Sequence, residues 1–391
     1  MCIIIIYSNS ELREMVDCKI TKGVKHMLQK FKVRNYKNFR DELIFSFITS
    51  KNYEFNKELV KDGIIKDSLV IGENASGKTN LGVAIFDIIC HLTDKGRKEI
   101  KLYSNLYNPD LPVEFDYTFR FGDSVLRYCY EKKDADSIMR EQIFVNDKKI
   151  LENSPAETKV LLKGTENLDL EKWDSSISLV KYVYANSVLD KKDETCTVFY
   201  QFMQYVNNML WFSSTEGNRY MGFSNEKGNL FETVANTEGA IEKLQSFLQE
   251  MGICYQLLVK DDGESKNIYT RMGKKVVPLA SLISSGTRSL IFFFLWYMQI
   301  EKCSFLYVDE FDAFYHTDLA KAVIRKIIEI PNVQAVITSH NTDLMTNDLL
   351  RPDCIFKLED NRIKPFSELT DKSLREAHNL QKMYKAGAFN D

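Results

Sequence analysis

The 391-residue sequence lacks the patterns that mark secreted, fibrous or membrane-spanning chains. Its 8 cysteines are scattered and include no Cys-x-x-Cys pair, which excludes a zinc ribbon and a thioredoxin-type redox pair. Only 7 prolines and 17 glycines occur, too few for a collagen-like or long disordered chain. The longest apolar run, Leu290 to Met298, is far shorter than the ~20 residues of a membrane-spanning helix. Because no secretory signal is visible either, we expect a cytoplasmic protein with reduced thiols.

The charge balance also lacks a dominant sign. The chain has 52 Lys and Arg against 55 Asp and Glu, which gives a net charge of −3. This balance argues against a protein that coats nucleic acid by bulk charge. A local basic run, Lys95 to Lys98 with Lys101, leaves DNA contact open, although a solvated helix end is the simpler interpretation.

Hydrophobic periodicity predicts an α/β fold. Apolar residues alternate with polar ones over 31–35, 43–47 and 113–130, which indicates antiparallel strands. Leu69–Ile71, Phe305–Val308 and Ala335–Thr338 are continuous apolar runs typical of buried parallel strands. Thr195 to Phe212 and Thr237 to Met251 have helical spacing. We therefore expect an N-terminal extension (1–26), a first half of the main domain (27–151), a helical insert (152–252) and a second half (253–391).

The strongest motif is a glycine-rich loop between a predicted strand and a predicted helix. It satisfies G-x-x-x-x-G-K-[ST] and consists of Gly72, Glu73, Asn74, Ala75, Ser76, Gly77, Lys78 and Thr79, followed by Asn80. In such a loop the glycines let the backbone wrap a phosphate, and the helix N-terminus supplies N–H donors. Lys78 would neutralise the β- and γ-phosphates, and Thr79 would place its hydroxyl on Mg²⁺. We predict a nucleotide triphosphate site, with ATP and Mg²⁺ as cofactors.

A second motif places two acids directly after a buried strand. Asp309 follows Phe305 to Val308 and matches the acid that holds Mg²⁺ in phosphate-loop enzymes. Glu310 is next and is suited to polarise the attacking water as a general base. An apolar strand followed by Asp-Glu is common by itself, so this prediction depends on the phosphate loop.

Two further loops complete the set. Leu282 to Arg288 contains Ser284, Ser285 and Gly286 and opens the apolar helix. Ser284 and Gly286 match the serine and second glycine of the L-S-G-G-Q signature of ABC-type ATPases, whereas Ser285 and Thr287 depart from it. An ordinary serine N-cap also explains Ser284. A predicted buried strand ends at His340, at the position where ABC-type ATPases have a switch histidine. Asp312 lies in the loop that follows Glu310.

Together these motifs resemble the ATP-binding heads of SMC/ABC-type ATPases. The sequence is most similar to stand-alone bacterial AAA-type ATPases related to the OLD (overcoming lysogenisation defect) family. The matching segments are "FKVRNYKNFRDELIFSF", "GENASGKTN", "SSGTRSL", "YVDEFDAFYH", "ITSHNTDLM" and "NLQKMYKAGAF". The resemblance covers most of residues 27–391 and is weak over 152–252. It implies a P-loop NTPase fold with a parallel-centred sheet, an antiparallel β subdomain and an inserted helical subdomain.

The resemblance also implies how such a head works. Two ATPs would lie between two copies of the chain, each held by the phosphate loop of one copy and the signature of the other. Asp312 would cross that interface, Arg34 and Asn35 would approach the nucleotide, and Gln142 is a candidate for the Q-loop glutamine. The family suggests an ATPase of anti-phage defence with a separate effector protein, a nuclease or a toxin, and the short stretch after His340 leaves no room for a Toprim nuclease domain.

Two other functions remain open on the sequence. One is a nucleotide-gated DNA-binding head in DNA repair, although a zinc hook and a long coiled coil are missing. The other is a scaffold that binds ATP with negligible turnover. We expect no membrane association for any of the three.

Overall fold

The computed structural model describes residues 26–49, 51–95, 103–170, 173, 176–213, 219–222, 230–261, 263 and 266–389. All but the last residue of the expected N-terminal extension, and all of the basic run except Lys95, lie outside these residues. Within the described part, no helix is both long enough and apolar enough to cross a membrane.

The first large sheet is antiparallel and has seven strands in the order β10-β9-β8-β7-β6-β1-β2. The predicted alternation is seen in β6, where every second side chain is buried and the others are partly or fully exposed. One face of this sheet therefore packs on the core and the other faces solvent. Its strands are β1 (His26–Arg34), β2 (Leu43–Ser46), β6 (Val113–Phe121), β7 (Ser124–Lys132), β8 (Ile138–Val145), β9 (Lys148–Asn153) and β10 (Thr158–Val160).

The second large sheet is central and has the order β12-β11-β16-β17-β5-β18-β19. The five inner strands run parallel, and the edge strands β12 and β19 are antiparallel. Every residue of β5, β16 and β17 is buried, as the continuous apolar runs predicted. The strands are β5 (Asp67–Ile71), β11 (Met209–Ser213), β12 (Arg219–Gly222), β16 (Phe305–Asp309), β17 (Gln334–Ser339), β18 (Ile355–Glu359) and β19 (Arg362–Pro365).

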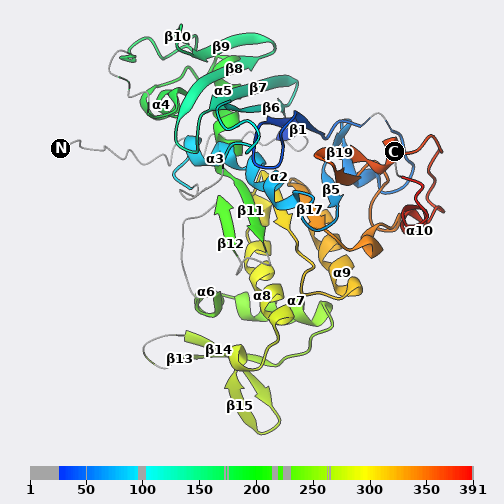
Figure 1. Cartoon of the computed structure of the whole chain (residues 1–391). Helices are drawn as coiled ribbons and strands as arrows, with labels where there is room; N and C mark the ends of the chain where they lie inside the picture. The colour runs from blue at the N-terminus through cyan, green and yellow to red at the C-terminus, as the bar shows by residue number, and fades with distance from the viewer. Residues whose placement is uncertain are drawn as a thin grey trace.

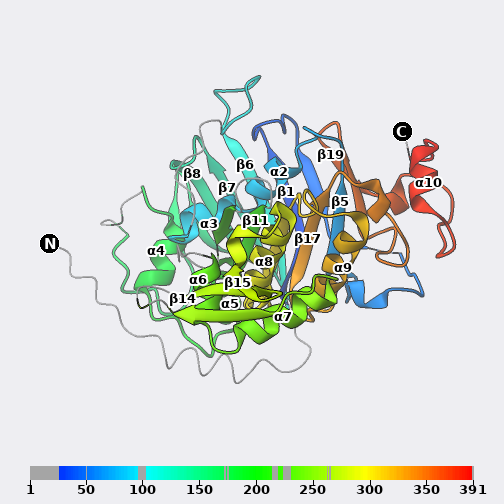
Figure 2. The same ribbon diagram turned by 90° about the horizontal axis from the view of Figure 1, so that it is seen from below.

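Two small sheets and the helices complete the described fold. β3 (Val60–Lys61) pairs with β4 (Ile64–Ile65), and β13 (Leu257–Asp261), β14 (Lys266–Met272) and β15 (Lys275–Pro278) form a separate sheet at the lower end of Figure 1. The helices are α2 (Lys78–Ile85), α3 (Asp87–Leu92), α4 (Leu179–Asn186), α5 (Glu194–Asn207), α6 (Leu230–Asn236), α7 (Ala240–Glu250), α8 (Ser285–Tyr297), α9 (Thr317–Ile328) and α10 (Leu380–Lys385). Figures 1 and 2 show α7, α8 and α9 on the side of the central strands opposite the antiparallel sheet.

Helix α2 lies between the two large sheets. On one side Gly82 faces the ring of Tyr307 in β16, so closely that a Cβ atom at Gly82 would lie 2.5 Å from Tyr307 Cε1. On the other side Tyr117 of β6 donates its hydroxyl to the carbonyl of Ala84 at 3.0 Å. The helix that follows the phosphate loop is therefore held from both faces.

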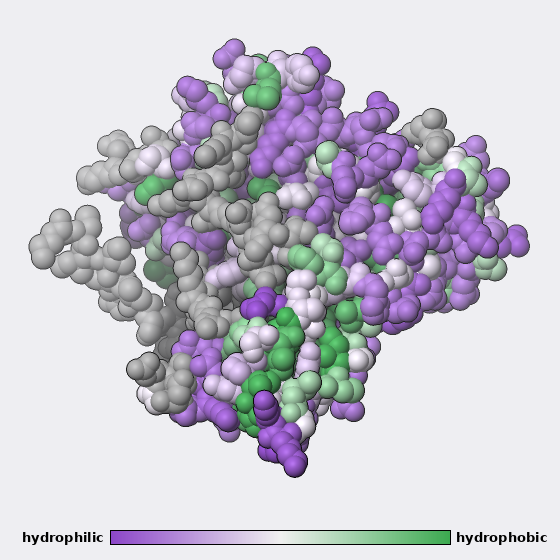
Figure 3. Space-filling model, turned by 60° about the horizontal axis from the view of Figure 1, so that its bottom comes forward, coloured by the Kyte–Doolittle hydropathy of each residue, from purple (hydrophilic) through white to green (hydrophobic). Residues whose placement is uncertain are grey.

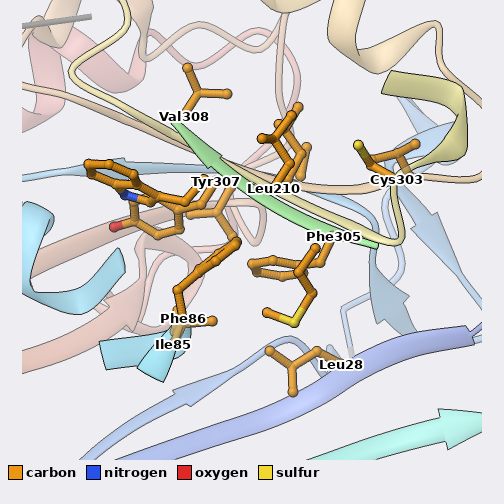
Figure 4. Close-up of a cluster of buried hydrophobic side chains, with 14 of the residues drawn as sticks. Leu28, Ile85, Phe86, Leu210, Cys303, Phe305, Tyr307 and Val308 are labelled. Carbon is orange, nitrogen blue, oxygen red and sulfur yellow. The ribbon is translucent and has the colours of Figure 1, made fainter. Parts of the chain in front are cut away.

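The core is continuous between the sheets. Figure 4 shows Leu28, Ile85, Phe86 and Phe305 converging from β1, the α2–α3 junction and β16. Buried Gln334, at the start of β17, is the main polar link: it accepts from Leu28 N at 2.8 Å and donates to Leu28 O at 2.9 Å and Ile65 O at 3.0 Å. Its amide joins the antiparallel sheet to the central one.

The structure corrects the prediction of a purely helical insert over 152–252. Met209 to Phe212 were expected to continue a helix, but α5 ends at Asn207 and β11 begins at Met209. A short apolar run fits a buried strand as well as a helix. Here parallel pairing with β16 decides the outcome, because it satisfies the backbone of Leu210 and Trp211 inside the core. Residues 152–252 thus contribute an inner strand of the central sheet as well as α4 to α7.

Candidate nucleotide-binding site

The phosphate loop has the geometry that its sequence predicted. It joins the end of β5 at Ile71 to the start of α2 at Lys78. Gly77 adopts φ +101°, and a Cβ atom there would lie 2.5 Å from Asn38 Nδ2, so only glycine fits. Glu73, Asn74 and Ala75 are exposed, which leaves the outer side of the loop accessible.

Lys78 is buried inside this loop. Its ammonium donates to Gly72 O at 2.8 Å and to Glu73 O at 2.9 Å. Burial lowers the pKa of Lys78, whereas the nearby carboxylates of Glu310 and Asp309 raise it. The ammonium is thus held by neutral carbonyl groups, which a phosphate oxygen would outcompete as an acceptor.

Thr79 and Asp309 meet although they are 230 residues apart in the sequence, with Thr79 Oγ1 donating to Asp309 Oδ2 at 2.8 Å. Burial raises the pKa of Asp309 to about 6, and the hydrogen bonds from Thr79 and Thr338 oppose that rise. A hydroxyl and a carboxylate are oxygen donors that suit Mg²⁺, which usually takes only one or two protein ligands and keeps several waters. Among the described residues, no group of three or more His, Cys, Asp and Glu side chains could hold a metal ion. The pair therefore fits Mg²⁺ bound together with substrate phosphate.

The acidic loop after β16 is fixed by the end of β17. Glu310 is partly exposed and has the left-handed φ of +46°, and its N–H donates to Thr338 Oγ1 at 2.9 Å. Asp312 is 6% exposed and accepts from Ser339 Oγ at 2.7 Å. Burial raises the pKa of Asp312, against the effect of that hydrogen bond. The exposed His340 follows Ser339 directly. The loop of the predicted base and the loop of the predicted switch histidine are therefore connected by the hydrogen bonds of Thr338 and Ser339.

Thr338 and Ser339 were not among the site residues predicted from the sequence. The signal was present, because both are polar residues at the carboxyl end of a buried strand. In open parallel sheets this end carries the ligand site. Pairing of β16 with β17 then brings their hydroxyls to the acids that follow β16.

The signature loop supplies the N-cap residue of α8, Ser284. Ser284 Oγ accepts from Thr287 N at 3.1 Å, so the N-cap interpretation is correct, while Ser284 and Ser285 remain exposed and available to a second molecule. A Cβ atom at Gly286 would lie 2.8 Å from Phe314 O. Gly286 is therefore needed for the close contact between the signature loop and the acidic loop.

Three predicted residues make contacts outside the phosphate loop. Buried Asn35 donates its amide to the carbonyls of Asn108, Leu111 and Pro112, and so holds the loop before β6. Arg34 pairs with Glu114 at 3.5 Å, and Gln142 in β8 donates to Glu152 at 2.7 Å. Arg34 and Gln142 both line a charged hollow of about 270 Å³ over β1, β6, β7 and β8. These contacts give no support to a nucleotide role for Asn35 or Gln142.

An asparagine network braces the start of α2 instead. Asn80 Nδ2 donates to Asn38 Oδ1 at 2.6 Å, and Asn38 Nδ2 donates to Asn361 Oδ1 at 2.8 Å. Lys37 Nζ also reaches Asn80 Oδ1 at 3.4 Å. Nothing in the sequence near Asn38 indicates its partner Asn361, which lies in the turn between β18 and β19.

Comparison with known proteins gives one family match and several structural ones. Residues 214–346, about a third of the chain, match the family model described as "AAA domain, putative AbiEii toxin, Type IV TA system". No curated protein matches the chain. The SMC head domain from Thermotoga maritima aligns at a TM-score of 0.44 with 14% identity, over 86% of this chain and 98% of that chain.

Two further solved structures are similar. The Smc head domain bound to the C-winged helix domain of ScpA has a TM-score of 0.42 and 14% identity, over 86% of this chain and 96% of that chain. The Smc head domain with an extended coiled coil bound to the C-terminal domain of ScpA, derived from Pyrococcus furiosus, has a TM-score of 0.42 and 13% identity, over 92% and 98%.

The described residues have a P-loop NTPase fold similar to that of SMC heads, with mixed α/β content and several sheets. The phosphate loop follows β5, the signature loop opens α8, and the acids and the histidine follow β16 and β17. The fold class expected from the motifs is therefore confirmed.

Proposed function

We propose that this protein is a cytoplasmic Mg²⁺-dependent ATPase of the ABC/SMC type, which binds and hydrolyses ATP between two copies of the chain. The observation that carries the proposal is the contact of Thr79 with Asp309, since it brings the phosphate loop to the acidic strand end. Such a contact serves no purpose in a chance glycine turn. It is the arrangement that a triphosphate with its metal ion requires.

Each group then has a distinct task. Lys78 would bind the β- and γ-phosphates, and Thr79 with Asp309 would hold Mg²⁺, which would supply positive charge against the phosphates. Glu310 is the residue in the acidic loop that polarises the attacking water. His340, exposed beside that loop, contacts the γ-phosphate.

The second copy supplies the signature. Ser284 to Gly286 are exposed or partly exposed, and the neighbouring Leu282 and Phe314 are each 44% exposed. Figure 3 shows apolar side chains gathered toward the lower part of the face that it presents, below a mainly hydrophilic region. Apolar groups beside an exposed helix N-terminus suit a protein surface that closes over a nucleotide. ATP would favour the closed pair, and hydrolysis would reopen it.

The test is phosphate release combined with sedimentation. Wild-type protein should release phosphate from Mg·ATP. Glu310→Gln should abolish release and accumulate an ATP-bound dimer, because substrate is bound but not consumed. Glu329→Gln, at an exposed position just after α9, is the matched control and should behave like wild type. Absence of turnover together with absence of a Glu310→Gln dimer would refute the proposal.

We further propose a role in anti-phage defence, as the regulatory ATPase of a separate effector protein. The family model over residues 214–346 supports this, because its description names a toxin–antitoxin system. The effector surface should be tested by substitutions on α4 rather than by deleting 152–252, since that deletion would also remove β11 from the core. Protection of cells from phage that survives Lys78→Ala would contradict an ATP-driven role.

A further inference from the structure

The end of β17 presents a buried hydroxyl to the acidic loop. Thr338 is fully buried, and its Oγ1 donates to Asp309 Oδ1 at 2.9 Å. The same oxygen accepts the N–H of Glu310, also at 2.9 Å. A hydroxyl has one proton to donate, so the donor is used on Asp309 and the oxygen remains free to accept from Glu310.

We infer that Thr338 is a positioning residue of the site, which sets the direction of both the metal-binding acid and the general base through one hydroxyl. The inference rests on the proposed function, since it assigns Thr338 a task in that ATPase. It concerns a residue with no predicted nucleotide contact of its own, which acts on the reacting groups through Asp309 and Glu310.

The two carboxylate oxygens of Asp309 accept hydrogen bonds from two different elements, helix α2 and strand β17. Oδ2 accepts from Thr79 at the start of α2, and Oδ1 accepts from Thr338 at the end of β17. Two hydrogen bonds, one to each oxygen, fix the plane of a carboxylate. A single hydrogen bond would still allow the carboxylate to rotate. The oxygen shared with Thr79 thereby stays directed at the metal position.

The backbone of Glu310 is held in an unusual conformation. Its φ of +46° is left-handed, a conformation that residues other than Gly, Asn and Asp seldom adopt. The hydrogen bond from Glu310 N to Thr338 stabilises this turn at the point where β16 ends. Without that acceptor the turn can relax to a more ordinary conformation, and the carboxylate of Glu310 moves away from the water that it should polarise. A misplacement of about 1 Å can cost on the order of 100-fold in rate.

The experiment compares Thr338→Val, which has the same shape but no hydroxyl, with Thr338→Ser, which keeps the hydroxyl. Thr270→Val is the matched control, because Thr270 is fully buried in β14 and its hydroxyl has no hydrogen-bond partner within the described structure. Three quantities are measured: turnover at saturating ATP, the Mg²⁺ concentration for half-maximal turnover, and binding of a fluorescent ATP analogue with Mg²⁺ and with EDTA.

Thr338→Val should lower turnover by roughly 10- to 100-fold and raise the Mg²⁺ requirement several-fold, while binding in EDTA stays within about twofold. Thr338→Ser and Thr270→Val should stay close to wild type. The inference is overturned if Thr338→Val matches wild type, if Thr338→Ser is as impaired as Thr338→Val, or if Thr338→Val weakens binding equally with and without Mg²⁺.

Failure of the proposed function would look different. Wild-type protein would then turn over no ATP, and the Mg²⁺ dependence of analogue binding would still decide whether Thr338 orients Asp309. A melting curve of each variant accompanies the assays. Should Thr338→Val not fold, Thr338→Ala removes the same hydroxyl without adding volume and takes its place.

Discussion

Buried Asp67 should make the stability of this protein depend on pH in a direction opposite to that of most carboxylates. Asp67 opens β5, is 0% exposed, and lies 2.7 Å from Lys66 Nζ. Burial raises its pKa to about 7, and the neighbouring Lys66 only partly offsets this. Lys66 also donates to the carbonyls of Ile328 and Ile330, so Asp67 is not its only hydrogen-bond acceptor among the described residues.

The sign follows from proton binding. Between about pH 4 and pH 7 the folded chain keeps a proton on Asp67 that the unfolded chain has released, so the free energy of unfolding falls as the pH rises through this range. One pKa unit corresponds to about 1.4 kcal/mol, so the loss from about pH 5 to about pH 7 is of the order of 3 kcal/mol. Above the folded pKa the loss is complete.

The assay is urea unfolding of wild type and Asp67→Asn over that pH range. Asparagine has the shape of the protonated acid and does not titrate, and all other groups cancel in the difference. We expect Asp67→Asn to gain stability relative to wild type steadily from about pH 5 to about pH 7. A variant that is less stable than wild type at neutral pH, by leaving Lys66 without its counter-ion, would show that the pair is ionised and refute the reasoning.

Two more substitutions test the packing around the site. Gln334→Leu leaves Leu28 N, Leu28 O and Ile65 O buried without the partner that Gln334 supplies. At ~1–3 kcal/mol for each group, it should lower the free energy of unfolding by roughly 3–9 kcal/mol in urea titrations. A change below about 1 kcal/mol would contradict the role of Gln334 as the link between the sheets. Gly286→Ala places a methyl group 2.8 Å from Phe314 O, so it should reduce ATP turnover at least about tenfold and leave ATP binding to the monomer unchanged. Equal turnover in Gly286→Ala and wild type would show that the signature loop moves freely.

The parts of the site that the sequence predicted are those in which one short segment contains the whole signal. The phosphate loop needs glycine where φ is positive, as at Gly77, and a strand and a helix on either side, and all of this is local. The buried strand that ends at Asp309 could be predicted for the same reason, because its continuous apolar run is local. The role of Asn35 could not be predicted in this way. The sequence near Asn35 does not distinguish an exposed residue from a buried structural one, because its partners lie in the distant loop from Asn108 to Pro112.

The parts that escaped prediction depend on which strands become neighbours. Nothing near Met209 distinguishes the end of α5 from a strand, and only the pairing of β11 with β16 settles it. Thr338 likewise lies 29 residues from Asp309 in the sequence. Its hydroxyl can be assigned to the site only once β17 is known to pair with β16.

The strand order explains why these contacts form one unit. β17 lies between β5, which carries the phosphate loop, and β16, which carries the acids. Thr79 binds Asp309 across that gap, and Thr338 binds Asp309 from the strand between them. Asp309 is therefore hydrogen-bonded to Thr79 and to Thr338, and Thr338 is followed in the chain by Ser339 and His340. Through Thr338 the middle strand thus links the acid that contacts the phosphate loop to the segment that ends in the predicted switch histidine, His340.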